Sequence, residues 1–337
     1  MFFYIIRRMI AVVVMLLIIS LTTFLVFFAA PTDPASLTCA KNCTAATIEG
    51  NRKLLGFDKP IPVQYANFLK GFFVARDFPD DPEQKRLAPK TVFTCDAPCL
   101  GYSQVKARSV TEIVKEGLPI TASIALGAFV LWIVFGVLFG IIAALRRGTW
   151  VDRLLVGISL VGYSLPSFFI GVLLLTFVAI KWQLVDIPRF VPLAEDPVAW
   201  LKGIFLPSVT LAAVFAASYV RLTRAYMLET MSEDYIRTAR AKGVKEVTVV
   251  RRHGLRAALT PIVTAAGLDL GGLLGGAIIS EQVFNFQGLG WTAIQAIQNT
   301  DLPVIVAIVV VASFFIVIAN LVVDILYGVI DPRVRMS

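Results

Sequence analysis

The sequence predicts an all-α integral membrane protein with six transmembrane helices, and two observations carry this prediction. First, 57% of the 337 residues are hydrophobic and 16% are charged, whereas soluble domains have about 45–50% apolar and about 25% charged residues. Second, the apolar residues form blocks, and six blocks approach the roughly 20 helical residues that cross a bilayer. The predicted spans are residues 9–30, 118–145, 154–180, 203–220, 257–280 and 302–323.

The first and third spans each need a separate argument. Arg7 and Arg8 precede the first block, as basic residues precede a cleaved secretory signal. A cleaved signal has an apolar region of about 7–15 residues, whereas this block runs for about 22, so an uncleaved span is favoured. The third block contains Pro166, which would kink a soluble helix but is tolerated in lipid where neighbouring helices satisfy the freed carbonyl.

Basic residues in the short loops predict the orientation, because cytoplasmic loops carry an excess of Lys and Arg. One alternating set of loops includes nine basic residues from Arg221 to Arg256, whereas the opposite set holds few. Both termini are therefore predicted to be cytoplasmic. The expected regions are a cytoplasmic N-terminus with the first helix (1–30), an extracytoplasmic loop domain (31–117), a five-helix core (118–330) with a cytoplasmic loop at 225–256, and a cytoplasmic C-terminus (331–337).

All four cysteines fall in the predicted loop domain, as two Cys-x3-Cys pairs: Cys39 with Cys43, and Cys95 with Cys99. In an oxidising compartment they predict two disulfides that staple this loop, and three pairings are possible. Bonds between the two pairs would close about 55 residues and restrict the unfolded chain most. The alternative is a zinc site, since four thiolates suit zinc.

A few polar residues lie in or beside the fifth predicted span. Asp269 is near its middle, where a charge costs about 2.5–3.5 kcal/mol on insertion scales, so it should face protein or water. Asp269, with Glu281 and Gln282 at the outer end, is a candidate for lining a translocation pathway. Asp269 could equally be a paired residue that fixes helix contacts. Glycines spaced by four in this span indicate close helix packing or a pathway lining.

The most basic stretch runs from residue 234 to 261, with seven Lys or Arg and the chain's one histidine. Placing these charges across a bilayer would cost on the order of 20 kcal/mol, so the stretch is predicted to be cytoplasmic. Ile236, Ala239 and Gly243 are spaced to form a small apolar strip on a short helix, and Gly243 suits the left-handed residue after its end. A second helix is expected to resume near Lys245. The strip favours a surface gripped by another protein over a merely solvated anchor.

At this stretch the sequence resembles a family. "YIRTARAKG" followed by "RRHGLRAALTPIVT" is similar to the cytoplasmic coupling loop of permease subunits of ATP-binding cassette importers, in the dipeptide, oligopeptide and nickel branch. The resemblance continues in "GYSQVKARSVTEIVKEGLPIT", "YSLPSFFIGVLLL", "GGAIISEQVFNFQGLG" and "VDILYGVIDPRVR", and it covers nearly the whole chain. Where the wider class has Glu-Ala-Ala and later Gly, this chain has Arg237, Thr238 and Ala239, then Gly243.

The resemblance implies a type I importer permease fold in a bacterial cell membrane. It implies four protein partners: a second, similar permease, two cytoplasmic ATP-binding subunits that bind ATP and Mg²⁺, and an extracytoplasmic binding protein. It implies no cofactor in this chain, no nucleic acid, and a cargo of short peptides, or else nickel or another small solute. The residues expected to couple to the ATP-binding subunits are Tyr235, Ile236, Arg237, Thr238, Ala239, Arg240, Ala241, Lys242 and Gly243.

Two other classes of protein are disfavoured. The sequence has no G-x-x-x-x-G-K-[ST] phosphate loop, no H-E-x-x-H and no G-x-S-x-G, so a non-catalytic subunit is expected. A secondary transporter that works alone typically has repeats, broken helices and charges near mid-membrane for ion coupling. Only Asp269 meets the last criterion. No metal site is expected outside the cysteine alternative.

Overall fold

The computed structural model describes residues 2–28, 34–37, 44–79, 85–86 and 92–330, and it is mostly helical. Within these ranges, five helical runs are long and apolar enough to cross a membrane. They lie in α1 (Phe2–Phe28), α6 (Val110–Leu145), α9 (Pro197–Ser232), the run Glu246–Leu274 and α15 (Leu302–Ile330). The run Glu246–Leu274 consists of α11 (Glu246–Thr248), η3 (Val249–Gly254) and α12 (Leu255–Leu274).

The third predicted span, residues 154–180, is wrong as one continuous helix. The chain instead forms α7 (Trp150–Ser164) and then α8 (Ser167–Leu173) with η2 (Leu174–Lys181), and the two parts are bent by 98°. Leu165 has an extended backbone, at φ −84° and ψ 132°. A residue before proline avoids the helical region, and Pro166 has no N–H to continue the ladder. The described part of the chain therefore has five candidate spans, or six if the bent pair is counted as one.

The fifth predicted span also ends earlier than expected. α12 stops at Leu274, and Ser280 belongs to a separate helix, α13 (Ile278–Phe284). Gly276 lies between them with φ 144°, and an added Cβ would meet the Gly290 Cα at 2.8 Å. Only glycine adopts this backbone so close to another chain segment. α14 (Leu289–Gln298) follows α13 and leads into α15.

Side-chain caps begin several of these helices. Ser109 accepts a hydrogen bond from the Thr111 N–H at the start of α6 (3.1 Å), and Thr149 caps α7. Asp196 accepts from the first backbone N–H groups of α9, with Pro197 at the first helical position. Such caps satisfy N–H groups that have no partner inside a helix.

Small residues let the long helices pack closely. Gly136 and Gly140 on α6 face α9, and an added Cβ at Gly136 would lie 2.6 Å from the Tyr219 Cβ. The glycines spaced by four on α12 face α15: a Cβ at Gly271 would lie 2.6 Å from the Ala319 Cβ, and one at Gly275 equally close to Ala312. Close helix packing is therefore the role of this glycine series in the fold.

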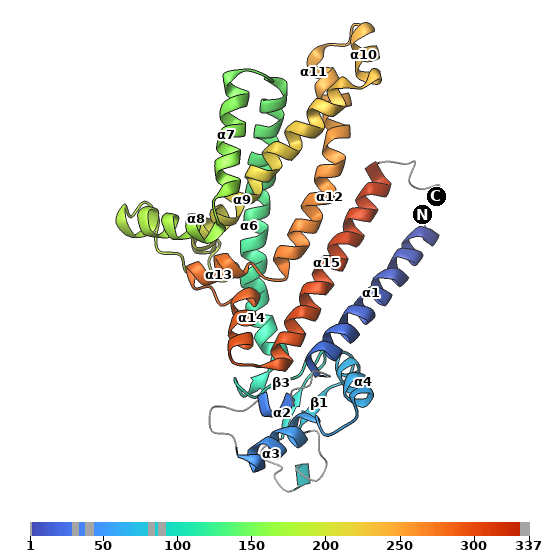
Figure 1. Ribbon diagram of the computed structural model, residues 1–337, viewed down its shortest axis with the longest axis vertical. Coiled ribbons are helices and arrows are strands. Elements are labelled where there is room, and N and C mark those ends of the chain that lie inside the picture. Colours follow the sequence, from blue (N-terminus) through green and yellow to red (C-terminus); the bar gives the residue numbers. More distant parts are fainter. Residues whose placement is uncertain (1, 29–33, 38–43, 80–84, 87–91, 331–337) are drawn as a thin grey trace.

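The loop domain lies at one end of the helix bundle, and the short helix α10 (Asp234–Ala241) lies at the other (Figure 1). The loop domain contains α2 (Pro34–Leu37), α3 (Ala45–Leu55) and α4 (Ile61–Gly71). Strand β1 (Arg76–Phe78) pairs with β2 (Phe93–Cys95), and β3 (Tyr102–Ser103) pairs with β4 (Arg108–Ser109), both antiparallel. These strands correct the prediction of an entirely α-helical chain.

An aromatic cluster fixes the loop domain to the bundle. Phe24 and Phe28 of α1 stack with ring centroids 4.3 Å apart. Phe24 also packs on Phe68 of α4, and Phe28 on Phe57 before α4. The Tyr65 hydroxyl shares a 2.9 Å hydrogen bond with Ser20 of α1. Aromatic pairs of this kind contribute beyond their buried area, so α1 and α4 form one packed unit.

Candidate functional site

The candidate site is α10 and the turns that hold it at the end of the bundle opposite the loop domain (Figure 1). α9 runs well past the predicted residue 220 and ends at Ser232, so it carries the chain out to α10. Glu233, with φ −65° and ψ 150°, breaks the helix between α9 and α10. The next helical run begins at Glu246, close to the predicted Lys245.

The end of α10 has the predicted left-handed glycine. Gly243 has φ 76°, its N–H donates to the Arg240 carbonyl (2.9 Å), and the Val244 N–H donates to the Ala239 carbonyl (3.3 Å). This pair of bonds is a Schellman ending, which satisfies the last carbonyls of a helix. An added Cβ at Gly243 would meet nothing within 4 Å. Backbone conformation, not lack of space, therefore requires glycine here.

The apolar strip of α10 faces its own chain. Ile236 is fully buried, as is Val249 of η3, and α10 packs against both η3 and α9. Ala239 is half-buried and Gly243 is exposed. Within the predicted strip, Ile236 therefore anchors α10 to the rest of the chain, whereas Gly243 is open to solvent. A helix as short as α10 is not stable alone, so it needs the buried Ile236 side chain to hold it against the rest of the chain.

The outward face of α10 is polar and mostly basic. Tyr235 is 46% exposed, and the other exposed residues of α10 are Asp234, Arg237, Thr238, Arg240 and Ala241, followed by the exposed Lys242. Asp234 forms an ion pair with Arg237 at 3.3 Å. The Arg240 guanidinium pairs bidentately with the Glu246 carboxylate, at 3.0 and 2.7 Å, and its hydrogen bonds raise the Arg240 pKa. Burial and then the charge of Glu233 raise the pKa of the Tyr235 phenol, so it remains a neutral hydroxyl. The face presents hydrogen-bond donors on a backbone fixed at both ends.

An ion pair braces α9 below α10, and no local pattern in the sequence predicts it. The Asp152 carboxylate of α7 accepts from Arg224 of α9 at 2.6 and 2.8 Å, and from the Gly148 N–H at 2.9 Å. Asp152 is only 4% exposed. The pair joins the turn between α6 and α7 to the helix that carries α10. Its partners are 72 residues apart, which is why spacing could not reveal it.

The candidate pathway residues do not share one environment. Asp269 accepts a 2.6 Å hydrogen bond from the buried Tyr219 hydroxyl, so it joins α12 to α9. Gln282 is exposed on α13, whereas its neighbour Glu281 is fully buried. Glu281 accepts hydrogen bonds from Thr121 and from backbone N–H groups. These contacts place Asp269 and Glu281 between packed helices.

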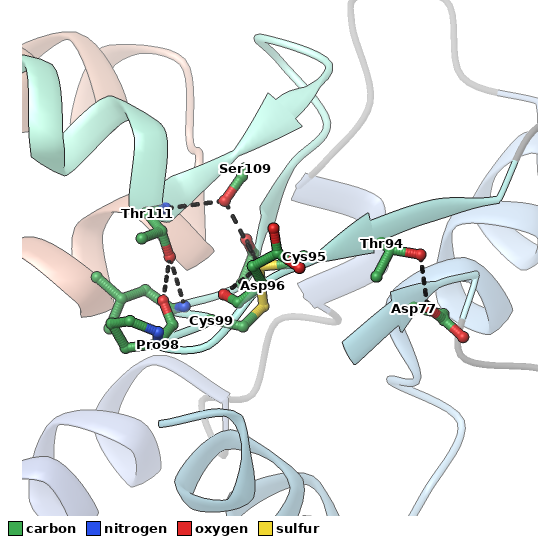
Figure 2. Close-up of a disulfide and its surroundings, with 10 residues drawn as sticks. Asp77, Thr94, Cys95, Asp96, Pro98, Cys99, Ser109 and Thr111 are labelled. Carbon is green, nitrogen blue, oxygen red and sulfur yellow. Dashed lines mark hydrogen bonds between the residues drawn. A yellow bond between two sulfur atoms is a disulfide. The ribbon is translucent and has the colours of Figure 1, made fainter. Parts of the chain in front are cut away.

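The structure pairs Cys95 with Cys99 in a disulfide (Figure 2). Neither can then bond across to the other cysteine pair, so this choice excludes the staple between pairs. Cys39 and Cys43 lie outside the described residues. The zinc alternative loses two of its four thiolates. Within the described ranges, no group of three His, Cys, Asp or Glu residues is placed to hold a metal ion.

Hydrogen bonds tie the disulfide loop to the start of α6 (Figure 2). The Thr111 hydroxyl donates to the Pro98 carbonyl at 2.6 Å and accepts from the Leu100 N–H at 3.0 Å. The Cys95 Sγ lies 3.5 Å from the Ser109 hydroxyl. The Cys99 N–H donates to the Gly71 carbonyl at the end of α4 (2.7 Å). The disulfide loop is therefore held by α4 within the loop domain and by α6 of the bundle.

Comparison with known proteins gives a consistent result. A family described as the inner membrane component of binding-protein-dependent transport systems matches residues 136–336, and the N-terminal part of such membrane components matches residues 1–125. A putative peptide transport system permease protein of Brucella abortus is 35% identical over 315 residues, 94% of this chain and 93% of that protein. The glutathione transport system permease protein GsiC of Escherichia coli K12 is 37% identical over 312 residues, 93% of this chain and 92% of that protein.

Proposed function

Because the chain belongs to the family of inner membrane components of binding-protein-dependent transport systems, we propose that it is a permease subunit of an ATP-driven peptide importer. It is a multi-pass membrane protein, and as a permease subunit it is not catalytic. ATP and Mg²⁺ would be bound by partner subunits. The chain would build half of a translocation pathway with a second, similar permease, in a type I importer fold.

The observation that carries this proposal is the exposed helix α10. It projects from the bundle end opposite the loop domain, it is anchored through Ile236, and its outward face carries Tyr235, Arg237 and Lys242. A short helix held this rigidly can transmit a push without bending. Each of two cytoplasmic ATP-binding subunits would grip one such helix, through residues 235–243, and closure on ATP would rock the spans between inward-open and outward-open states.

The opposite end would face an extracytoplasmic binding protein. The disulfide Cys95–Cys99 fits an oxidising compartment, which supports placing the loop domain outside. The ends of α1 and α15 away from the loop domain point toward the α10 end (Figure 1), in keeping with cytoplasmic termini. We infer that α7 with α8 and η2 forms the sixth, broken span in a bacterial inner membrane. Broken helices at membrane depth require protein or water around the break.

The cargo class follows from the named relatives, which are peptide and glutathione permeases. Short peptides are therefore the proposed substrates. The test is uptake of labelled dipeptides, tripeptides, longer peptides and glutathione by cells with and without this chain. We expect at least one class to enter only when the chain is present. Uptake of nickel alone, or of peptide by the purified chain in vesicles without any ATP-binding subunit, would overturn the proposal.

A further inference from the structure

The unit formed by α13 and α14 is packed tightly into the half of the bundle nearer the loop domain. α13 contacts α8, α9 and α14, and α14 contacts α6 and α15. Two glycines make this packing possible: an added Cβ at Gly290 would lie 2.7 Å from the Ile278 Cα, and one at Gly288 would lie 2.5 Å from the Glu281 Cδ. The two helices therefore behave as one folded-back unit between α12 and α15.

Glu281 is the polar centre of this unit. Its Oε1 accepts from the Thr121 hydroxyl at 2.7 Å and from the Ala277 N–H at 3.2 Å, and its Oε2 accepts from the Trp291 N–H at 2.8 Å. The side chain has no exposed surface, and no Lys or Arg of the described ranges forms an ion pair with it. A buried carboxylate is kept only where donors surround it. Here every donor comes from α6, α14 or the turn before α13.

Thr121 connects α6 to both halves of the unit. Its hydroxyl donates to the Glu281 carboxylate, and it accepts at 2.8 Å from the backbone N–H of Leu289, the first residue of α14. Gly117, one turn earlier on α6, allows the backbone of residues 288 and 289 to approach: its added Cβ would lie 3.2 Å from both. One hydroxyl thus closes α13 and α14 onto α6.

The loop domain reaches the same unit through Trp291. The backbone N–H of Trp291 donates to the Glu281 carboxylate, and the Lys106 ammonium lies 5.7 Å from the centre of the Trp291 ring. Lys106 belongs to the turn between β3 and β4. Beside it, the Ser103 hydroxyl of β3 donates to the buried Asp301 carboxylate just before α15. Contacts therefore run from the β3–β4 hairpin to the Glu281 carboxylate.

The candidate coupling site reaches the unit from the other end. Glu246, which holds Arg240 of α10, begins a continuous helical run to Leu274. That run ends at Gly275 and Gly276, and α13 begins two residues later. This helical run therefore links α10 to the glycine break that precedes α13.

We propose that Glu281 is a positioning residue, and that with Thr121 it forms a latch that holds the outer end of the permease closed. This inference rests on the proposed function, because the latch would be opened by docking of the binding protein on the loop domain and by movement of α12. The latch releases when the bond between Glu281 and Thr121 breaks and α13 with α14 leaves α6. Spatial connection alone does not show coupling, so the test measures opening itself.

The test compares Thr121→Val, which removes the hydroxyl at constant shape, with Thr121→Ser, which keeps it. Each is combined with Thr292→Cys, a position on α14 that is 3% exposed here. The assembled transporter is labelled from outside with a membrane-impermeant maleimide, and the exposed position Gln282→Cys reports reagent access in each background. The chain without an added cysteine supplies the background labelling.

In Thr121→Val we expect Thr292→Cys to label about tenfold faster, and ATP hydrolysis without binding protein to rise by a similar factor, which corresponds to about 1.4 kcal/mol. Thr121→Ser should match the parent in both measurements. Unchanged labelling in Thr121→Val, or equal changes in Thr121→Ser, would overturn the latch. If Thr121→Val fails to assemble, Glu281→Asp supplies the same test, because it withdraws the carboxylate from Thr121; its labelling must rise. Peptide uptake by the parent chain decides the proposed function separately, since labelling needs no cargo.

Discussion

Helix α10 and the segment from α13 to the start of α15 place their polar residues in opposite ways. At α10 and the residue after it, the charged residues Arg237 and Lys242 are exposed, and one buried apolar side chain, Ile236, holds the helix in place. At the loop-domain end, the polar residues Glu281 and Asp301 are buried, and hydrogen bonds hold them.

The difference indicates two kinds of surface. Exposed charges on a fixed helix are available to another protein and cost little to keep in water. Buried carboxylates are costly unless every hydrogen-bond donor is in place, so they favour one arrangement of the helices. When that arrangement changes, the hydrogen bonds to each carboxylate are lost together. We therefore expect changes at the α10 end to alter docking, and changes at the loop-domain end to alter which conformation is populated.

The largest expected effect is at Ile236. Ile236→Ala removes the buried anchor of α10 and should cost about 2–5 kcal/mol of local stability. We expect membrane insertion to be unchanged and peptide uptake to fall at least tenfold, because a loosened α10 cannot transmit motion. Val247→Ala is the control, because Val247 is 77% exposed on the next helix. Equal uptake in the two variants would show that α10 needs no anchor.

The next largest effect is at the ion pair that braces α9. Asp152→Ala leaves Arg224 without its carboxylate, a loss of about 2 kcal/mol for hydrogen bonds to a charged group. This corresponds to a fall of about 3 °C in the unfolding temperature of the purified protein, measured in detergent. Adding Arg224→Ala should cause little further loss, since the two side chains act as a pair. Additive losses in the double variant would contradict the bracing role, and the exposed Arg153→Ala should change nothing.

The disulfide should have an effect on stability of similar size, confined to the loop-domain end. Cys95→Ser opens a very short closed loop, for which the chain-entropy relation gives about 2 kcal/mol. We expect faster proteolysis of the loop domain in the variant and unchanged docking at α10. In the parent chain Cys95 and Cys99 should resist thiol labelling until a reductant is added. Immediate labelling of both would show that the bond is absent.

The smallest expected effect is at Gly243, and it sharpens the comparison within the α10 end. Gly243→Ala forces a left-handed backbone on a residue with a Cβ, at a cost of about 1 kcal/mol. Gly148→Ala is a matched control, because Gly148 has φ 79° and also has nothing within 4 Å of an added Cβ. We expect equal stability losses but a several-fold drop in uptake for Gly243→Ala alone. Equal uptake would mean that the end of α10 has no part in coupling.

Much of the fold and of the α10 end could be predicted from the sequence because the signals there are local. The span predicted at residues 118–145 ends at the last residue of α6, and the span predicted at 302–323 begins at the first residue of α15, since charge-free runs of that length have few alternatives in a membrane. The end of α10 at Gly243 follows from glycine chemistry alone. Pro166 predicts a disturbed helix, but whether a proline kinks a helix or breaks it depends on spatial neighbours that the sequence does not specify.

The loop-domain end could not be predicted in the same way, because its contacts join distant parts of the chain. Thr121 and Glu281 are 160 residues apart, and Ser103 and Asp301 are 198 apart. Nothing in the spacing of Glu281 distinguishes a pathway-lining carboxylate from a buried one. The inward direction of Ile236 was missed for a related reason: periodicity defines a face of a helix but not what covers it.

Docking of an ATP-binding subunit on α10 is tested most directly by photo-crosslinking in the assembled transporter. A photoreactive residue is placed at Arg237, on the outward face, and in a second chain at Trp150, which is the first residue of α7 and is 73% exposed. Capture of an ATP-binding subunit from position 237, and much weaker capture from position 150, is the expected result. Capture of no such subunit from position 237, in a transporter that still hydrolyses ATP, would contradict the assignment of α10 as the coupling helix.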